Sequence, residues 1–370
     1  MRAWTTWPCM RSITGMISTS SFINNGEIYL KILLLEYITA GGFNDAPLPD
    51  SLLREGMLMR DALLRDFGAV AQVEITTTFD ARLDEPKPQA QHKMQSYAVH
   101  TNTHPTEIWQ KLLSECDAAL VVAPETDGIL HHLTQSLETA PIVNLGCNAA
   151  SVKLTASKLA TSRVLQQSGI TTIPSYKADT FDCALAADNS LNGYVVKPND
   201  GAGCENTWYF EDSSALNHWL QSNAEVLFKF LIQPYQTGLA ASFSMLCKQG
   251  KAWVLACNEQ KIEIDRTYSH LKYSGSYVNA LARHYADFNE LAQRIAETIP
   301  GLNGYVGVDV IIEDGVIYIV EINPRITTSY IGLQQSLHYN PAELILGLVN
   351  EDFSLPKHLT THAVEVHVNA

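Results

Sequence analysis

The sequence has little positive charge, no C-x-x-C pair and no long hydrophobic run. It carries 25 lysine and arginine residues against 39 aspartate and glutamate residues, a formal net charge of −14. This balance argues against nucleic acid or an anionic membrane surface as the main partner. No apolar stretch approaches the length of a membrane span. The seven cysteines are dispersed, which favours reduced thiols in a cytoplasmic protein over a disulfide framework or a zinc site.

Two nucleotide-binding motifs are also missing. Gly41-Gly42 follows an apolar run without the G-x-G-x-x-G spacing of a dinucleotide-binding fingerprint, so a turn required by the backbone explains these glycines. The segment 199–207 carries glycines between two strand-like runs but is not a Walker A loop. Its backbone N–H groups can still close over phosphates. The alternative is an ordinary hairpin beside a surface lysine, Lys197.

The length of 370 residues predicts two or three compact units. After a first stretch without a continuous apolar core, which indicates a disordered or non-native extension, apolar runs alternate with helical spacing. That alternation predicts an α/β fold with a parallel sheet. Residues 86–97 are polar and are expected to form a loop, and residues 151–168 are expected to form one helix. The expected boundaries are 1–28, 29–148, 149–236 and 237–370.

A hairpin near the C-terminal end carries acidic groups inside apolar strands. Two runs rich in valine, isoleucine and tyrosine flank Asp314-Gly315, a strong hairpin signal. Asp309 lies in the first run, and Glu321 and Asn323 share one face of the second. The hairpin can therefore bring the three side chains together.

Three such oxygen-bearing side chains would repel or stay unsatisfied unless a cation lay between them. Mg²⁺ fits, because it prefers a few carboxylates together with water and substrate phosphates. The alternative is a solvated hairpin face whose acids point into water.

In their order along the chain, these stretches resemble the ATP-grasp superfamily of carboxylate–amine ligases over about residues 31–350. The matching signals are a lysine on the helix after the first unit, the V-V-K-P strand with its glycine loop, a hinge strand and the late Asp…Glu-x-Asn pattern. A closer likeness is to the tyramine–glutamate ligase branch used in methanofuran-type cofactor synthesis. That likeness rests on Leu35–Gly42, Arg54–Met57, Ala123–Gly128 and Asn323–Tyr330.

The resemblance implies a pre-ATP-grasp domain followed by two α+β subdomains that clamp ATP, the central one acting as a lid. It also implies a role for each matched residue. Lys158 and Lys197 would hold the ATP phosphates, as compact cations do. The lid loop would comprise Gly201, Ala202, Gly203 and Cys204. Adenine contacts would come from Gln233, Pro234, Tyr235 and Gln236.

The resemblance also implies metal ligands on the hairpin and two catalytic residues. Asp309, Glu321 and Asn323 would hold two Mg²⁺ ions, with Mn²⁺ as an alternative ion. Arg325 and Lys197 are the expected catalytic residues, with Arg325 contacting the transferred phosphate and the intermediate. Three places depart from the family pattern, which are Ser157, the segment Leu239–Ala241 and Gly307. The departure at Leu239–Ala241, where relatives often have a ribose-binding acid, leaves ribose recognition unassigned.

The activity implied by the resemblance is amide formation through an acyl phosphate, with release of ADP. Glutamate would supply its γ-carboxylate, and tyramine, tyrosine or a related amine would attack it, in a methanofuran-like pathway of one-carbon metabolism. Arg266, Lys272 and Arg325 are candidates for the α-carboxylate of the amino acid, although the first two could equally be surface charges. A homodimer is common among the relatives.

Three rival interpretations remain open at this point. One is another ATP-grasp amino-acid, dipeptide or polyglutamate ligase. Another is a non-catalytic sensor module that binds ATP, and the last is a biotin-carboxylase-like subunit.

Overall fold

The computed structural model of the chain describes residues 23–24, 27–88, 93–182, 192–201, 206–265, 269–357, 359 and 361–368. Most of the predicted extension, residues 1–28, lies outside this part. The residues of this extension that the structure describes, Ile23–Asn24 (β1) and Glu27–Ile28 (β2), pair antiparallel. No helix of the described chain is both long and apolar enough to cross a membrane.

The N-terminal unit is a parallel sheet of five strands in the described residues, as the alternation of strands and helices predicts. The central strands are buried almost throughout, so they read as continuous apolar runs. From one edge to the other, the strands are Lys93–Val99 (β5), Val73–Asp80 (β4), Leu30–Glu36 (β3), Ala118–Val122 (β6) and Val143–Asn144 (β7). The accompanying helices are Asp50–Gly68 (α2), Pro105–Leu113 (α3) and Ile129–Thr139 (α4).

The expectation of a loop over residues 86–97 is wrong for its last five residues. Lys93–Val99 forms the edge strand β5, paired in register with β4. Its first six side chains alternate between exposed and half-buried, because only one face of this edge strand is covered. The polar residues that suggested a loop are the solvent-facing half of this strand.

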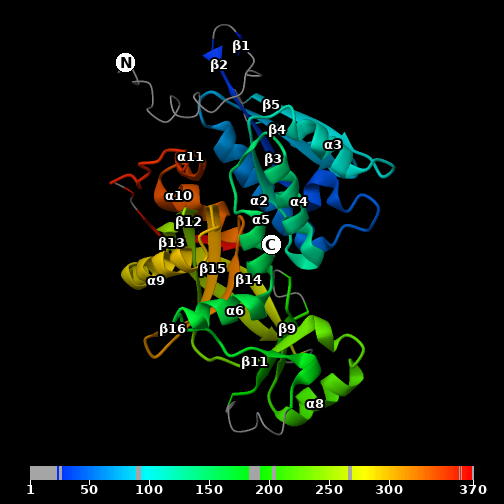
Figure 1. Cartoon of the computed structure of the whole chain (residues 1–370), viewed down its shortest axis with the longest axis vertical. Helices are drawn as coiled ribbons and strands as arrows, with labels where there is room; N and C mark the ends of the chain where they lie inside the picture. The colour runs from blue at the N-terminus through cyan, green and yellow to red at the C-terminus, as the bar shows by residue number, and fades with distance from the viewer. Residues whose placement is uncertain are drawn as a thin grey trace.

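The rest of the described chain is built around one antiparallel sheet of ten strands. The longest strands are in its middle, and Figure 1 shows this sheet below the N-terminal unit. In order across the sheet, the strands are Val316–Asn323 (β16), Gly304–Glu313 (β15), Leu239–Lys248 (β12), Lys251–Asp265 (β13), His270–Val278 (β14), Trp208–Phe210 (β10), Tyr194–Pro198 (β9), Phe230–Pro234 (β11) and Tyr176–Lys177 (β8), with Val364–His367 (β17) beside β14. The helices of this part are Ala149–Ala156 (α5), Lys158–Gln167 (α6), Ser213–Ser222 (α8), Tyr285–Thr298 (α9), Leu333–Leu337 (α10) and Pro341–Gly347 (α11).

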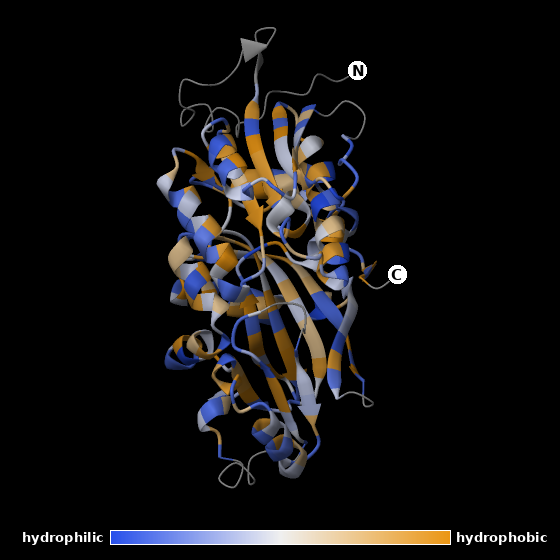
Figure 2. Cartoon of the chain, turned by 90° about the vertical axis from the view of Figure 1, so that its right-hand side faces the viewer, coloured by the Kyte–Doolittle hydropathy of each residue, from blue (hydrophilic) through white to orange (hydrophobic). Residues whose placement is uncertain are grey.

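The core continues from one sheet to the other. One cluster of buried side chains joins Leu33 and Val121 of the N-terminal sheet to Phe243, Val308 and Phe288 of the larger unit. Figure 2 shows the alternating apolar and polar bands along the long strands that supply this core. The lobe containing β9, β11 and α8 has a smaller core of its own. The subdomain boundaries stay predictions, although this separate core agrees with a central lobe.

The predicted hairpin of β15 and β16 is confirmed. Asp314 and Gly315 both have positive φ, as a type I′ turn requires. Asp309 lies opposite Glu321, and Gly307 lies opposite Asn323. The register shifts directly after Asp309, and such bulges redirect side chains next to functional sites.

Candidate active site

A cavity of about 310 Å³ opens where the N-terminal unit, the central lobe and the hairpin of β15 and β16 meet. Every predicted nucleotide-binding, metal-binding and catalytic residue that the structure describes lines this cavity. These residues are Lys158, Lys197, Gly201, Gln233, Pro234, Tyr235, Gln236, Asp309, Glu321, Asn323 and Arg325. Ala202, Gly203 and Cys204 of the predicted lid loop lie outside the described residues.

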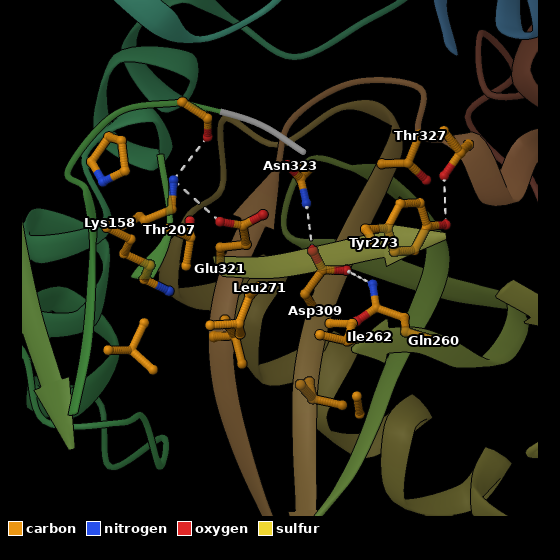
Figure 3. A pocket seen from close by; sticks show the side chains of 18 of the residues that line it. Lys158, Thr207, Gln260, Ile262, Leu271, Tyr273, Asp309, Glu321, Asn323 and Thr327 are labelled. Carbon is orange, nitrogen blue, oxygen red and sulfur yellow. Dashed lines mark hydrogen bonds and ion pairs between the residues drawn. The ribbon is translucent and has the colours of Figure 1, made fainter. Parts of the chain in front are cut away.

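Asp309, Glu321 and Asn323 meet on one face of the hairpin (Figure 3). The Asn323 amide donates to Asp309 Oδ2 at 3.2 Å, and Gln260 of β13 donates to Asp309 Oδ1 at 2.8 Å. No group of three or more His, Cys, Asp or Glu residues suited to a metal occurs in the described chain. The set is therefore two carboxylates and amide groups, which suits a hard cation better than zinc.

The two carboxylates of this group experience opposite electrostatic environments. Burial, followed by the negative charge of Glu321, raises the pKa of Asp309 well above its usual range. Burial alone would also raise the pKa of Glu321, but Lys158 and Lys197 outweigh it and lower that pKa to about 2. Asp309 thus lacks the positive partner that Glu321 has, and a divalent cation bridging both carboxylates would supply it. The residues present fit Mg²⁺.

Lys158 reaches the hairpin from the start of α6. Its Nζ lies 3.2 Å from Glu321 Oε2 and donates to the carbonyl of Gly201 at 2.8 Å. The expected single helix over 151–168 is wrong, because the backbone is extended at Ser157. Ser157 ends α5 and caps α6, with its hydroxyl accepting from the Ala160 N–H at 3.2 Å.

Asn199 explains why the helix breaks there. Its carbonyl accepts from the Lys158 N–H at 2.9 Å, and its side-chain oxygen accepts from the Leu159 N–H at 3.0 Å. The first N–H groups of a helix need outside partners, and the residue after the V-V-K-P strand provides them. Hydrogen bonds to Asn199 and Gly201 therefore link the glycine segment to the start of α6, where Lys158 lies. Lys197, two residues earlier on β9, is 7% exposed.

The hinge segment forms another wall of the cavity. Pro234 ends β11, as expected for a proline that cannot continue a strand interior. Gln233 is buried and donates to the Ser175 hydroxyl at 2.8 Å. The side chain of Gln236 donates to Glu313 at the end of β15. Gly238 has φ +126°, and a Cβ there would lie 2.5 Å from a backbone oxygen, so only glycine fits this turn.

Arg325, two residues after the end of β16, makes a contact for which the sequence provided no expectation. Its Nε donates to Glu125 Oε1 at 2.9 Å, and its Nη2 donates to Glu125 Oε2 at 3.0 Å. Burial tends to lower the pKa of Arg325, but the Glu125 charge reverses this and raises it. The signal that could have found Glu125 is its place in the family-like segment Ala123–Gly128.

The N-terminal unit contributes residues that the sequence did not identify as site residues. Glu36, Ile38, Leu52, Glu55 and Met59 line the same cavity. They come from the end of β3, the following turn and α2. Glu36, Ile38 and Glu55 belong to the segments Leu35–Gly42 and Arg54–Met57 of the family resemblance, and Leu52 and Met59 lie just outside them.

Glu36 explains why a glycine lies within helix α2. The Thr39 N–H and hydroxyl both donate to Glu36 Oε2, at 2.9 and 2.7 Å. Burial raises the pKa of Glu36. A Cβ on Gly56 would lie 2.6 Å from that same oxygen. Glycine at this helical position therefore leaves room for the carboxylate.

The remaining wall comes from β13 and β14. It includes Gln260, Ile262, Leu271 and Tyr273 (Figure 3). Tyr273 and Thr328 share a hydrogen bond of 2.8 Å between their hydroxyls, and burial raises the pKa of Tyr273 to about 12. Of the two uncertain basic candidates, Lys272 is exposed on β14 and is not among the cavity-lining residues, and Arg266 lies outside the described residues.

Two protein families match this chain. Residues 155–329 match the ATP-grasp domain, and residues 73–152 match the pre ATP-grasp 3 domain. The tyramine–L-glutamate ligase of Methanocaldococcus jannaschii is 32% identical over 332 residues, which cover 87% of this chain and 90% of that protein.

Two solved structures illustrate the likeness of fold. An ATP-grasp superfamily protein from Archaeoglobus fulgidus has a TM-score of 0.62 at 23% identity, covering 86% of this chain and 88% of that one. The biotin carboxylase domain of 2-oxoglutarate carboxylase from Hydrogenobacter thermophilus, a dimer solved with MgADP and bicarbonate, has a TM-score of 0.66 at 14% identity. It covers 90% of this chain and 72% of that one.

Proposed function

Because this chain belongs to the ATP-grasp family of carboxylate–amine ligases, we propose that it joins the γ-carboxylate of glutamate to tyramine or a related amine such as tyrosine. The chain is an ATP-dependent, ADP-forming ligase of C–N bonds that acts on small molecules. The choice of substrates is the proposed part. It follows the M. jannaschii relative, whose name states tyramine and L-glutamate, and it places the product in a methanofuran-like one-carbon carrier pathway.

The observation that carries this proposal is that two chemically different sets of residues line one cavity, which we call its cationic and its acidic end. Lys158, Lys197 and Arg325 line one part of the wall, where phosphates would be attracted. Glu36 and Glu55, with the apolar Ile38, Leu52 and Met59, line another. A carboxylate beside an apolar wall suits an ammonium group that a short carbon chain joins to an aromatic ring. Tyramine has this chemistry.

We assign the nucleotide to the part of the cavity between the central lobe and the hairpin. Lys158 and Lys197 would hold the phosphates, and Gln233, Pro234, Tyr235 and Gln236 would contact adenine. Gly201 begins the loop that would cover the phosphates. The support is that all of these residues line the same cavity, on elements far apart in sequence.

Asp309, Glu321 and Asn323 would hold Mg²⁺, and the proposal includes two ions, as the number of phosphates to be neutralised suggests. The raised pKa of Asp309 supports a missing positive charge at this position. Bound Mg²⁺ would neutralise charge on the phosphates. Mn²⁺ could serve as the alternative ion, because it accepts the same oxygen ligands.

The residues of the chain then act mainly by positioning and charge stabilisation. A carboxylate oxygen of the acid attacks the γ-phosphorus of ATP, the bond to the β-phosphate oxygen breaks, and ADP leaves. The acyl phosphate is then attacked by the neutral amine, which forms the amide and releases phosphate and one proton. Arg325 would stabilise the phosphoryl group in both steps. Water must be excluded because it would hydrolyse the acyl phosphate.

Two further parts of the proposal concern the protein as a whole. We propose a homodimer, which is common in the family and is the form of the H. thermophilus biotin carboxylase domain. A cytoplasmic location is proposed from the dispersed cysteines. Four of them in the described chain, Cys116, Cys147, Cys247 and Cys257, are buried free thiols.

The test is ADP release by purified protein with Mg²⁺ and ATP, with glutamate, and with or without tyramine or tyrosine. We expect ADP release that depends on both substrates, a product with the mass of the glutamyl amide, and loss of both in Asp309→Asn. An amide formed only with other amino acids would indicate a dipeptide or polyglutamate ligase. Bicarbonate-dependent ATP hydrolysis would indicate a carboxylase, and nucleotide binding without turnover would indicate a sensor.

A further inference from the structure

A buried ion pair links the N-terminal unit to the arginine of the cavity. Glu125 lies between strand β6 and the turn Thr126–Gly128 (η2), and Arg325 is 200 positions later. Two hydrogen bonds of 2.9 and 3.0 Å join the carboxylate to Nε and Nη2. The side chains are 4% and 10% exposed. A bidentate pair of this kind determines the plane of the guanidinium as well as its position.

Only part of the guanidinium is used by the protein. Its Nη1 donates to the carbonyl of Ile326 at 3.1 Å, in addition to the two bonds to Glu125. A guanidinium has five N–H groups, so the described contacts use three and leave two for a ligand. Arg325 lines the cavity, whereas Glu125 does not. Glu125 therefore acts on a ligand only through Arg325.

The backbone holds Glu125 firmly. The Gly128 N–H donates to the Glu125 carbonyl at 3.2 Å, and the Leu130 N–H donates to the Pro124 carbonyl at 3.1 Å. Asp127 and Gly128 both have left-handed backbone angles, with φ of +53° and +71°. This turn joins β6 to α4, so the carboxylate is attached to the rigid N-terminal sheet rather than to a long loop.

Stability alone is a poor explanation for such a pair. The loss of hydration on burying two charges offsets most of their attraction, and apolar residues of similar size commonly hold two units as well or better. What an apolar pair could not do is orient N–H donors at a cavity wall. The location of this pair therefore indicates a role in the reaction.

We propose that Glu125 is a positioning residue for Arg325. It holds the guanidinium where the two remaining N–H groups meet the phosphoryl group during transfer. This inference rests on the proposed function of Arg325 described above. It adds that the N-terminal unit, through one carboxylate, completes the phosphoryl-transfer site.

The first variant to test is Glu125→Gln, which keeps the shape of the side chain but removes its charge and one acceptor. We expect kcat to fall about 10- to 100-fold, as for other residues that orient a catalytic group. The KM for ATP should stay within about threefold, because Arg325 is proposed to act on the transition state. Positional isotope exchange in β,γ-bridge-labelled ATP, run with glutamate and no amine, should slow by the same factor as kcat.

A double-mutant cycle distinguishes a positioning role of Glu125 from a clamp, meaning a purely structural link between the N-terminal unit and the rest of the chain. If Glu125 acts through Arg325, Glu125→Gln should change kcat less than about twofold in an Arg325→Gln background. A simple clamp would instead reduce kcat by a similar factor in both backgrounds. Glu365→Gln is the matched control, because Glu365 pairs with Lys261 across 104 positions but is exposed and is not among the cavity-lining residues. Its kcat should equal that of the wild type.

The outcomes distinguish this inference from the proposed function. A wild-type enzyme that forms the amide, together with a Glu125→Gln variant of equal kcat, would overturn the positioning role alone. Independent effects in the double-mutant cycle would do the same. A wild-type protein without turnover or isotope exchange for any acid would instead remove the proposed function. If Glu125→Gln does not fold, Glu125→Asp, which keeps the charge but shortens the reach, should show an intermediate loss of kcat in the same cycle.

Discussion

The two ends of the cavity differ in charge and in origin. Lys158 and Lys197 of the central part, with Arg325 after the hairpin, form the cationic end, whereas Glu36 and Glu55 of the N-terminal unit form the acidic end. This contrast indicates that nucleotide and amine would be recognised by separate parts of the chain. Substitutions should therefore affect one substrate without affecting the other.

The largest effect is expected at the proposed Mg²⁺ ligands. Asp309→Asn should lower kcat by about 10³-fold or more, because it removes a charge needed to hold Mg²⁺ at the phosphates. The thermal midpoint should not fall, since the variant also removes the repulsion between Asp309 and Glu321. Steady-state ADP release measures kcat, and thermal unfolding measures the thermal midpoint. Asp314→Asn, at the exposed turn of the same hairpin, is the control, and equal losses in both variants would contradict the assignment.

A somewhat smaller effect is expected when the cationic end is broken. Lys158→Met should lower kcat/KM for ATP about 10²-fold, because a charge proposed to hold the phosphates is lost. It should also lower the thermal midpoint, since Glu321 loses the ammonium 3.2 Å away. Initial rates across ATP concentrations measure the first effect. Lys153→Met on the exposed face of α5 should change neither quantity, and a normal KM and kcat in Lys158→Met would remove Lys158 from the site.

A substitution at the acidic end should affect the KM for the amine and not the KM for ATP. Glu55→Gln should raise the KM for the amine about 10-fold, the size expected for losing a hydrogen bond to a charged group. The KM for ATP should not change. Kinetics with each substrate varied in turn tests this, with Glu107→Gln on the exposed face of α3 as the control. If the KM for ATP rises as much as that for the amine, the two ends are not separate.

The smallest effect is expected for a substitution beside Glu36, at the acidic end of the cavity. Gly56→Ala should lower the free energy of unfolding by about 1 kcal/mol. The added methyl group would overpack against the Glu36 carboxylate, which Thr39 holds by hydrogen bonds, and this cost outweighs the better helix propensity of alanine. Urea unfolding measures this change. Glu36→Asp should shorten the obstructing side chain, so the same alanine should cost less in that background. Stabilisation by Gly56→Ala alone would mean that Glu36 moves aside freely.

Features that depend on neighbouring residues were well predicted from the sequence. The hairpin follows from Asp314-Gly315 and the strands on either side, and its register brings Asp309 to Glu321. The parallel sheet follows from its buried, continuous apolar runs. The edge strand β5 was missed because half of its side chains face solvent. Its pairing with β4 is a property of the folded sheet and not of its own composition.

The missed features of the site depend on partners that are distant in sequence. The helix over 151–168 breaks at Ser157 because Asn199, 42 positions later, caps the start of α6. Local helical spacing contains no record of that partner. Glu36 and Glu55 lie within family-like segments, but nothing in those segments indicates that they line the same cavity as Lys158 and Lys197.

The hairpin with its acidic face, the parallel sheet and the candidate nucleotide-binding residues could be predicted from the sequence alone, because these depend on alternation, turn chemistry and motif order within short stretches. The pairing of Glu125 with Arg325 across 200 positions, and the acidic residues that the N-terminal unit adds to the cavity, are visible only in the folded chain. The physical reason is that a charge can be buried at low cost only beside a partner. Which partner that is depends on how the two sheets come together.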